Sequence, residues 1–256
     1  MANKQKKEQV DFGFKRVARE AKQSMVYDVF SSVAGKYDIM NDAMSFGLHR
    51  IWKDKMLSYI QPRNDTKMLD LAGGTGDIGF RYLKKAYALN LDASVIITDV
   101  NEHMLEEGKA RAVDQNILRN VEWAIVDAQE IPYDDNSFDF VTISFGIRNV
   151  TDRDKALTEI FRVLKPGGMF VCMEFSHVDH EILAKCYDLF SFNILPKMGK
   201  LIAGDEDSYR YLVESIREFP SREVFMAMMR TAGFESVSCE TLSQGVVALY
   251  AGVKPS

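Results

Sequence analysis

The sequence has few cysteines and no long apolar run. Cys172, Cys186 and Cys239 are the only three, and their wide spacing fits neither a C-x-x-C motif nor a disulfide framework. A reducing compartment is therefore expected, and no metal site is predicted. No apolar stretch approaches the roughly 18 to 20 residues that cross a membrane. The N-terminus also lacks the apolar segment of a signal peptide, so we expect a cytoplasmic protein.

The sequence also lacks an excess of positive charge. Its formal net charge of −5 at pH 7 argues against a general nucleic-acid binder. Residues 1–23 differ from the rest, because seven Lys or Arg against three Asp or Glu give them +4 and leave −9 elsewhere. Two interpretations of this basic arm stay open. It is either a solvated, partly disordered tail or a segment that contacts an anionic membrane surface.

Short apolar runs alternate with helical stretches through the middle of the chain, which is typical of βαβ units and a parallel sheet. Five strands are predicted, at 67–72, 94–100, 121–127, 138–146 and 168–175. Helices are expected from the glycine loop to about residue 88, at 101–116 and at 152–164. The turn KPGG ends the last of these helices. A further helix at 221–234 precedes two β-patterned runs, ESVSCETL and GVVALYAGVK, which predict an antiparallel hairpin at the sheet edge.

The remaining segments are additions to this core. Residues 24–60 are predicted to form a helical lid, and residues 177–220 a helical insertion whose aromatic residues cradle a substrate or simply belong to the core. The chain is therefore expected to fold as one α/β domain over 24–256, preceded by the arm at 1–23.

The stretch LAGGTGDIGF (71–80) follows the first strand, opens a helix and contains Gly74-x-Gly76-x-x-Gly79. Its glycines let a ligand approach the backbone closely, but they do not by themselves select a dinucleotide. Asp70 and Asp77 flank the loop, and two carboxylates would repel a pyrophosphate there. A ligand with an ammonium and a sulfonium would be attracted instead, and S-adenosylmethionine carries both. Asp77 has a second interpretation as a helix-dipole partner, and Gly79 is predicted to be a helix-packing residue.

Polar residues also stand at the ends of the next three strands. Asp99 ends the second strand, where an acid binds ribose hydroxyls. Asp127 and Ala128 end the third strand, where an acid accepts a hydrogen bond from the exocyclic amine of adenine. Ser144 ends the fourth strand. Ligands bind at the carboxyl edge of such sheets, so we expect one binding site there.

Several motifs resemble those of class I S-adenosylmethionine-dependent methyltransferases: DLAGGTGD, TDVN, VDAQEIPYDDNSFDFVTISFGIRNV and RVLKPGG. More narrowly, YDIMNDAMSFGLHRIWKD and FGIRNV resemble the ubiquinone/menaquinone biosynthesis C-methyltransferase family, from about Val29 to the C-terminus. The resemblance implies a Rossmann-like class I methyltransferase fold. This is a seven-stranded, mostly parallel sheet with an antiparallel C-terminal hairpin, N-terminal helices and a helical insertion after strand 5. It also implies that S-adenosylmethionine contacts Thr75, Asp99, Asp127, Ala128 and Ser144, with Asp70 and Gly73 close by.

The implied reaction is C-methylation of a polyprenylated quinol in menaquinone or ubiquinone biosynthesis. Its substrate would be a demethylmenaquinol, a 2-methoxy-6-polyprenyl-1,4-benzoquinol, or both. The expected partners are this quinol and the inner face of the membrane, and the choice between a homodimer and a quinone-synthesis complex stays open. Two alternatives are an NAD-dependent reductase, which Asp70 and Asp77 disfavour, and a non-catalytic cofactor-binding partner in a quinone-synthesis complex.

Methylation of a ring carbon requires an electron-rich ring, which a quinol supplies once a hydroxyl is deprotonated. Arg148, beside Asn149 in FGIRNV, is the main candidate to stabilise the phenolate. Arginine stays protonated, so a water, Tyr37 or a carboxylate is expected to move the proton. The alternative for Arg148 is a surface arginine in a helix-capping turn. His49 and His177 are further candidate bases or structural residues, and Tyr37, Asp38, Asn41 and Asp42 are candidate lid residues or turn formers.

Overall fold

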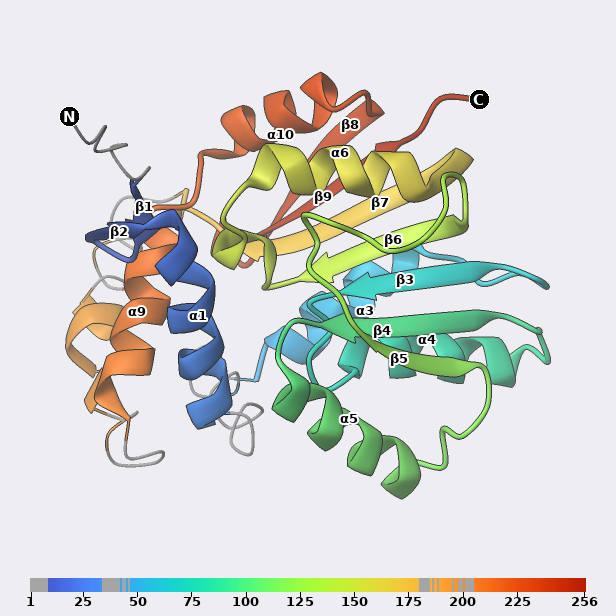
Figure 1. Ribbon diagram of the computed structural model, residues 1–256, viewed down its shortest axis with the longest axis horizontal. Helices are drawn as coiled ribbons and strands as arrows, with labels where there is room; N and C mark the ends of the chain where they lie inside the picture. The colour runs from blue at the N-terminus through green and yellow to red at the C-terminus, as the bar shows by residue number, and fades with distance from the viewer. Residues whose placement is uncertain are drawn as a thin grey trace, which may run out of the picture.

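The computed structural model describes residues 9–33, 42, 45, 47–179, 185, 187, 189–194, 196–197, 200 and 205–256. Its centre is a seven-stranded sheet with the order β5-β4-β3-β6-β7-β9-β8 (Figure 1). The strands are β3 (Lys67–Leu71), β4 (Ser94–Asp99), β5 (Val121–Ile125), β6 (Phe138–Ser144), β7 (Leu164–Phe175), β8 (Glu235–Leu242) and β9 (Val247–Val253). The first five are parallel, and β9 pairs antiparallel with both β7 and β8. The predicted fold class and the C-terminal hairpin are confirmed.

Helices cover both faces of this sheet (Figure 1). One face packs against α3 (His49–Tyr59), α4 (Asp77–Ala88) and α5 (Glu102–Asp114), and the other against α6 (Arg153–Val163) and α10 (Arg222–Thr231). Neighbouring strand residues alternate between the two apolar layers: Met68 packs into the first and Leu69 into the second. Because both faces of the sheet are buried, the strand sequences are nearly continuous apolar runs.

The predicted helix starts are confirmed by side-chain caps. Asn101, Asp152 and Ser221 each accept a hydrogen bond from the backbone N–H three residues later, at the starts of α5, α6 and α10. The start of β7 differs from the prediction, because the strand begins at Leu164 and includes KPGG. A register shift opposite Phe138–Phe140 accommodates this turn within the strand as a bulge.

The N-terminal segment and part of the 177–220 insertion lie together beyond the carboxyl ends of β3, β4 and β6 (Figure 1). They comprise β1 (Gln9–Phe12), β2 (Lys15–Ala18), α1 (Arg19–Val33), the π-helix η3 (Phe190–Ile194) and α9 (Glu206–Arg217). Residues 9–23 are therefore not a solvated tail: they form the β1–β2 hairpin and the start of α1. The Phe12 ring stacks on the Tyr211 ring of α9 at 4.1 Å between centroids, which fixes the hairpin to the insertion.

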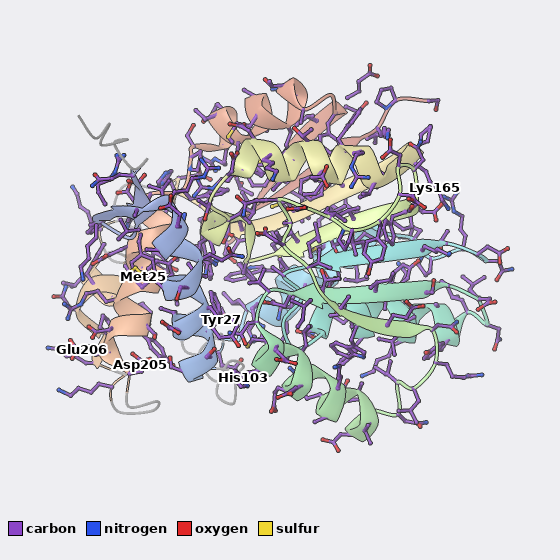
Figure 2. The ribbon with its side chains drawn as sticks, viewed as in Figure 1. Met25, Tyr27, His103, Lys165, Asp205 and Glu206 are labelled. Carbon is purple, nitrogen blue, oxygen red and sulfur yellow. The ribbon has the colours of Figure 1, made fainter. Side chains whose placement is uncertain are left out.

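Helix α1 is tied to the sheet through the start of α5. Asn101 Nδ2 donates to the backbone oxygen of Tyr27 at 3.0 Å and to Ser31 Oγ at 2.8 Å. Figure 2 labels Tyr27 and His103, whose rings lie 6.4 Å apart between α1 and α5. Asp205 at the start of α9 accepts a hydrogen bond from Ser32 Oγ. Helix α1 thus connects the carboxyl end of β4 with α9. None of the described helices is both long and apolar enough to span a bilayer.

Candidate functional site

A cleft of about 1040 Å³ lies at the carboxyl ends of β3, β4 and β6, under α1. Most of the site residues predicted from the sequence line it together: Asp70, Gly73, Thr75, Asp99, Asp127, Ala128, Ser144 and Asn149. Helix α1 contributes Gln23, Val26 and Phe30 to the opposite wall. The strand ends therefore meet at one site, as parallel topology requires.

The loop after β3 brings the backbone close to its neighbours at two glycines. A Cβ on Gly73 would lie 2.9 Å from Asp70 Oδ2, and Gly74 has a φ of +54°. Gly74 N donates to Asp99 Oδ2 at 3.1 Å, which links the loop to the end of β4. Gly79 has the predicted packing role, because a Cβ there would lie 2.7 Å from Ile97 Cδ1.

Asp70 is fully buried beneath this loop. Its Oδ1 accepts a hydrogen bond from Thr142 Oγ1 at 2.7 Å, and its Oδ2 has no partner among the described residues. Burial raises the pKa of Asp70 to about 7, although the Thr142 hydrogen bond acts in the opposite direction. Ser144 Oγ, which also lines the cleft, is likewise buried without a partner in the described part of the chain. Two polar atoms are thus left for a ligand to satisfy.

Asp99 and Asp127 are held in fixed orientations by backbone N–H groups. Asp99 Oδ1 accepts from Asn101 N at 2.9 Å, and burial raises the pKa of Asp99 to about 6. Asp127 Oδ1 accepts from Gln129 N at 2.9 Å. Asp127 Oδ2 accepts from Gln23 Nε2 of α1 at 3.2 Å, so the N-terminal helix contacts the third strand end.

Asp77 does not act as a free negative charge in the loop. Lys53 Nζ lies 2.7 Å from Asp77 Oδ2, and Arg81 Nε lies 3.0 Å from Asp77 Oδ1. Burial alone would raise the pKa of Asp77, but these two cations outweigh it and hold the pKa at about 2. The repulsion of a pyrophosphate inferred from the sequence therefore does not come from Asp77.

Lys53 is a cleft residue that the sequence analysis missed. It lies on α3, four residues after the buried His49 and four before the buried Leu57, on the apolar side of the helix. A lysine on the apolar side of a helix could have indicated a buried ion pair from the sequence, because lysine is almost never fully buried unless it is paired.

Arg148 lies beside the cleft and is not among its lining residues, so its predicted role at the phenolate stays a prediction. It follows β6 in the 3-10 turn η2 (Ile147–Asn149) and is buried rather than on the surface. Its Nη1 donates to Glu174 Oε1 at 2.7 Å and to the backbone oxygen of Phe145 at 2.6 Å, and its Nε donates to Ser215 Oγ. Glu174, buried on β7, also accepts from Arg148 N. Through these hydrogen bonds the guanidinium supports the turn.

The other catalytic candidates have separate positions. Asn149 lines the cleft, and its Oδ1 accepts a hydrogen bond from Tyr211 Oη of α9 at 2.9 Å. Tyr37, Asp38 and Asn41 lie outside the described residues.

Neither histidine candidate lines the cleft within the described chain. His49 is buried, and its Nε2 lies 2.9 Å from Asp42 Oδ1. Burial lowers the pKa of His49, although the hydrogen bond to Asp42 opposes this.

Comparison with known proteins gives one family. The model of the ubiE/COQ5 methyltransferase family matches residues 16–254. The chain is 52% identical over 252 residues to the ubiquinone/menaquinone biosynthesis C-methyltransferase of Hydrogenovibrio crunogenus, covering 98% of this chain and 97% of that one. It is 51% identical over 243 residues to the protein of that name from Ruegeria sp., covering 95% and 96%. It is 46% identical over 273 residues to the human mitochondrial 2-methoxy-6-polyprenyl-1,4-benzoquinol methylase, covering 95% and 84%.

Solved structures with a similar fold are more distant in sequence. Phosphoethanolamine N-methyltransferase 2 of Haemonchus contortus, in complex with S-adenosyl-L-methionine, has a TM-score of 0.56 and 19% identity. The match covers 80% of this chain and 52% of that longer one. An S-adenosylmethionine-dependent methyltransferase from Aquifex aeolicus has a TM-score of 0.56 and 17% identity, covering 78% and 88%. At such identities the likeness supports the fold alone.

The buried ion pair between Arg148 and Glu174 predicts a large loss of stability when one partner is removed. In Glu174→Ala, Arg148 keeps its buried charge without a carboxylate, so the free energy of unfolding should fall by about 3–5 kcal/mol in urea denaturation. Arg210→Ala, which removes a more exposed pair with Glu206, is the matched control and should cost less than about 1 kcal/mol. Equal losses in the two variants would contradict this account.

The buried carboxyl of Asp70 predicts a pH dependence. The pKa of Asp70 is about 7 in the folded protein against an ordinary 3.8, so the folded state holds this proton more tightly. Its contribution to the free energy of unfolding should therefore fall as pH rises, by about 1.4 kcal/mol per pH unit between pH 4 and 7. Asp70→Asn cannot ionise and serves as the reference for urea unfolding of the ligand-free protein. A stability difference between the two proteins that stays constant over this range would exclude the effect.

Proposed function

The chain belongs to the ubiE/COQ5 methyltransferase family, and on this premise we propose that it methylates a ring carbon of a polyprenylated quinol. S-adenosylmethionine is the methyl donor. The substrates are a demethylmenaquinol, a 2-methoxy-6-polyprenyl-1,4-benzoquinol, or both, in line with the names of the bacterial and human relatives. The family gives no support to the reductase alternative.

The observation that carries the proposal is the set of polar atoms in one cleft. The buried, unpartnered Asp70 Oδ2 suits the ammonium of the cofactor, and the glycines above it leave room for a close approach. Asp99 suits the ribose hydroxyls, and Asp127 with Ala128 suits the adenine. Thr75, Gly73 and Ser144 complete the binding set. When bound, the cofactor supplies an electrophilic methyl carbon.

Catalysis by this chain rests on orienting the quinol and on favouring its deprotonated form. Asn149 faces the cleft with Tyr211 Oη behind it, so its amide can hold a ring oxygen in a fixed position. Arg148, Arg153 and Glu174 meet next to this residue, where Arg153 Nη2 donates to the backbone oxygen of Arg148 at 2.9 Å. Two guanidiniums and one carboxylate leave a net positive charge beside the ring, which stabilises a phenolate without a direct contact. Tyr37 stays our candidate for the proton transfer.

The proposed contact with the membrane involves the end of the molecule formed by the hairpin and the insertion. The Phe14 ring, 57% exposed, stacks at 6.2 Å on Phe192, which is 38% exposed. The two rings border a groove of about 570 Å³ whose charged side chains are balanced, Lys197 and Arg210 against Glu206 and Glu214. Exposed apolar rings suit insertion into the interface of a bilayer, in which a polyprenyl quinol is dissolved. The 24–60 segment and the 177–220 insertion would then serve as lid and quinol-binding insertion.

Transfer of a labelled methyl group tests the function. The purified protein should methylate a demethylquinol but not the corresponding quinone, because only the reduced ring becomes electron-rich on deprotonation. Asn149→Ala should lower kcat about 100-fold, because the ring loses its fixed orientation, and change the S-adenosylmethionine Kd by less than about twofold. Transfer to no quinol of either series would leave the non-catalytic alternative standing.

Flotation with vesicles of anionic lipid tests the membrane contact. The double variant Phe14→Ser, Phe192→Ser should lose most of the bound fraction. Leu118→Ser removes a side chain that is 62% exposed on the loop before β5 and should bind as the wild type does. Equal binding by all three proteins would exclude this surface.

A further inference from the structure

The charges that line the cleft are of two kinds. Four carboxylates line it: Asp70, Asp77, Asp99 and Asp127. Among the described residues that line it, Lys53 is the only cation. S-adenosylmethionine carries two cationic groups, its ammonium and its sulfonium, and one anion, its carboxylate. The carboxylates of the cleft suit the two cationic groups of the ligand. The carboxylate of the ligand and Lys53 of the protein then remain as the other pair of opposite charges.

Lys53 is held firmly at the edge of this cleft. Its side chain is buried on α3, 4% exposed, and its Nζ lies 2.7 Å from Asp77 Oδ2. The neighbouring Trp52 anchors the helix, because its Nε1 donates to Ser243 Oγ at 2.9 Å and its ring packs near Phe145 and Phe175. A lysine ammonium has three N–H donors, and the described residues provide an acceptor for one of them. Within the described part of the chain, donors of Lys53 are therefore left for a ligand.

The local charge balance allows a zwitterion to bind there. Asp77 is shared by Lys53 and Arg81, and Arg81 also pairs with the exposed Asp54. These four side chains together carry no net charge. Asp70 is close enough for the positive charge of Lys53 to lower its pKa, against the larger effect of burial. A ligand end with one ammonium and one carboxylate thus meets an anionic group and a cationic group in the same cleft.

We propose that Lys53 binds the carboxylate at the amino-acid end of S-adenosylmethionine, while Asp70 receives the ammonium. This assignment rests on the proposed function, which supplies the identity of the cofactor. It gives α3 a part in cofactor binding, although this helix precedes the first strand of the sheet. A merely structural role, in which Lys53 only fastens α3 to α4 through Asp77, is the alternative.

Isothermal titration with two ligands separates these roles. Decarboxylated S-adenosylmethionine keeps the ammonium and the sulfonium but lacks the carboxylate. Lys53→Met should weaken binding of S-adenosylmethionine about 10- to 100-fold, as expected for a charged hydrogen bond, and change the Kd of the decarboxylated ligand by less than about twofold. Lys53→Arg should recover part of the loss. Lys55→Met, on the same helix but paired with Glu240 at the surface, is the matched control and should bind both ligands normally.

The outcomes that would overturn the inference are distinct. An equal loss for both ligands in Lys53→Met would mean a structural role, and no loss for either would mean no role. The wild-type protein gives a second test that requires no variant, since it should bind the decarboxylated ligand about 10- to 100-fold more weakly. Equal affinity of the wild type for the two ligands would refute the proposal. A wild type that binds neither ligand would instead refute the proposed function.

Discussion

The site depends on one unfavourable placement, a carboxyl group buried at the end of β3. Asp70 is surrounded by the sheet, the glycine loop and Thr142, and one of its oxygens has no partner among the described residues. Burial of such a group opposes its ionisation, as its raised pKa indicates. A cationic ligand group would reverse this, since a nearby positive charge stabilises the carboxylate. Binding of such a group would offset the cost of burying Asp70 and would couple ligand affinity to the protonation of this side chain.

The glycine loop follows from the same constraint, and the N-terminal helices add contacts to the other acidic residues of the cleft. Gly73 has to lack a side chain because Asp70 Oδ2 occupies the space below it. Helix α3 supplies the lysine that balances Asp77, and α1 supplies Gln23 to Asp127. The segment before β3 therefore does more than cover the sheet, because it contacts two of the four acidic residues in the cleft.

Much of this could be predicted from the sequence because the signals are local. The apolar runs, the capping residues Asn101, Asp152 and Ser221, and the strand-end acids each lie within a few residues of the feature they determine. The direction of the Arg148 side chain could not be predicted in this way. Its partner Glu174 is 26 residues away on a neighbouring strand, and only the pairing of β6 with β7 brings the two together. Lys53 and Asp77 are likewise joined by the packing of α3 on α4, which no local pattern encodes.

The turns after β3 and β6 have strained backbone conformations at the end of the sheet that borders the cleft. Ala72 and Phe145 have φ values of +48° and +58°, which are unfavourable for residues with a side chain and cost about 1–3 kcal/mol each. The two turns meet, because a Cβ on Gly146 would lie 2.6 Å from Ala72 Cβ. Phe145 is fixed from both sides, by its N–H to Met173 O and by its carbonyl, which accepts from Arg148. Neither turn can relax without displacing the other, so the ion pair between Arg148 and Glu174 supports both. This ion pair can therefore determine where Ser144 and Asn149 present their polar atoms.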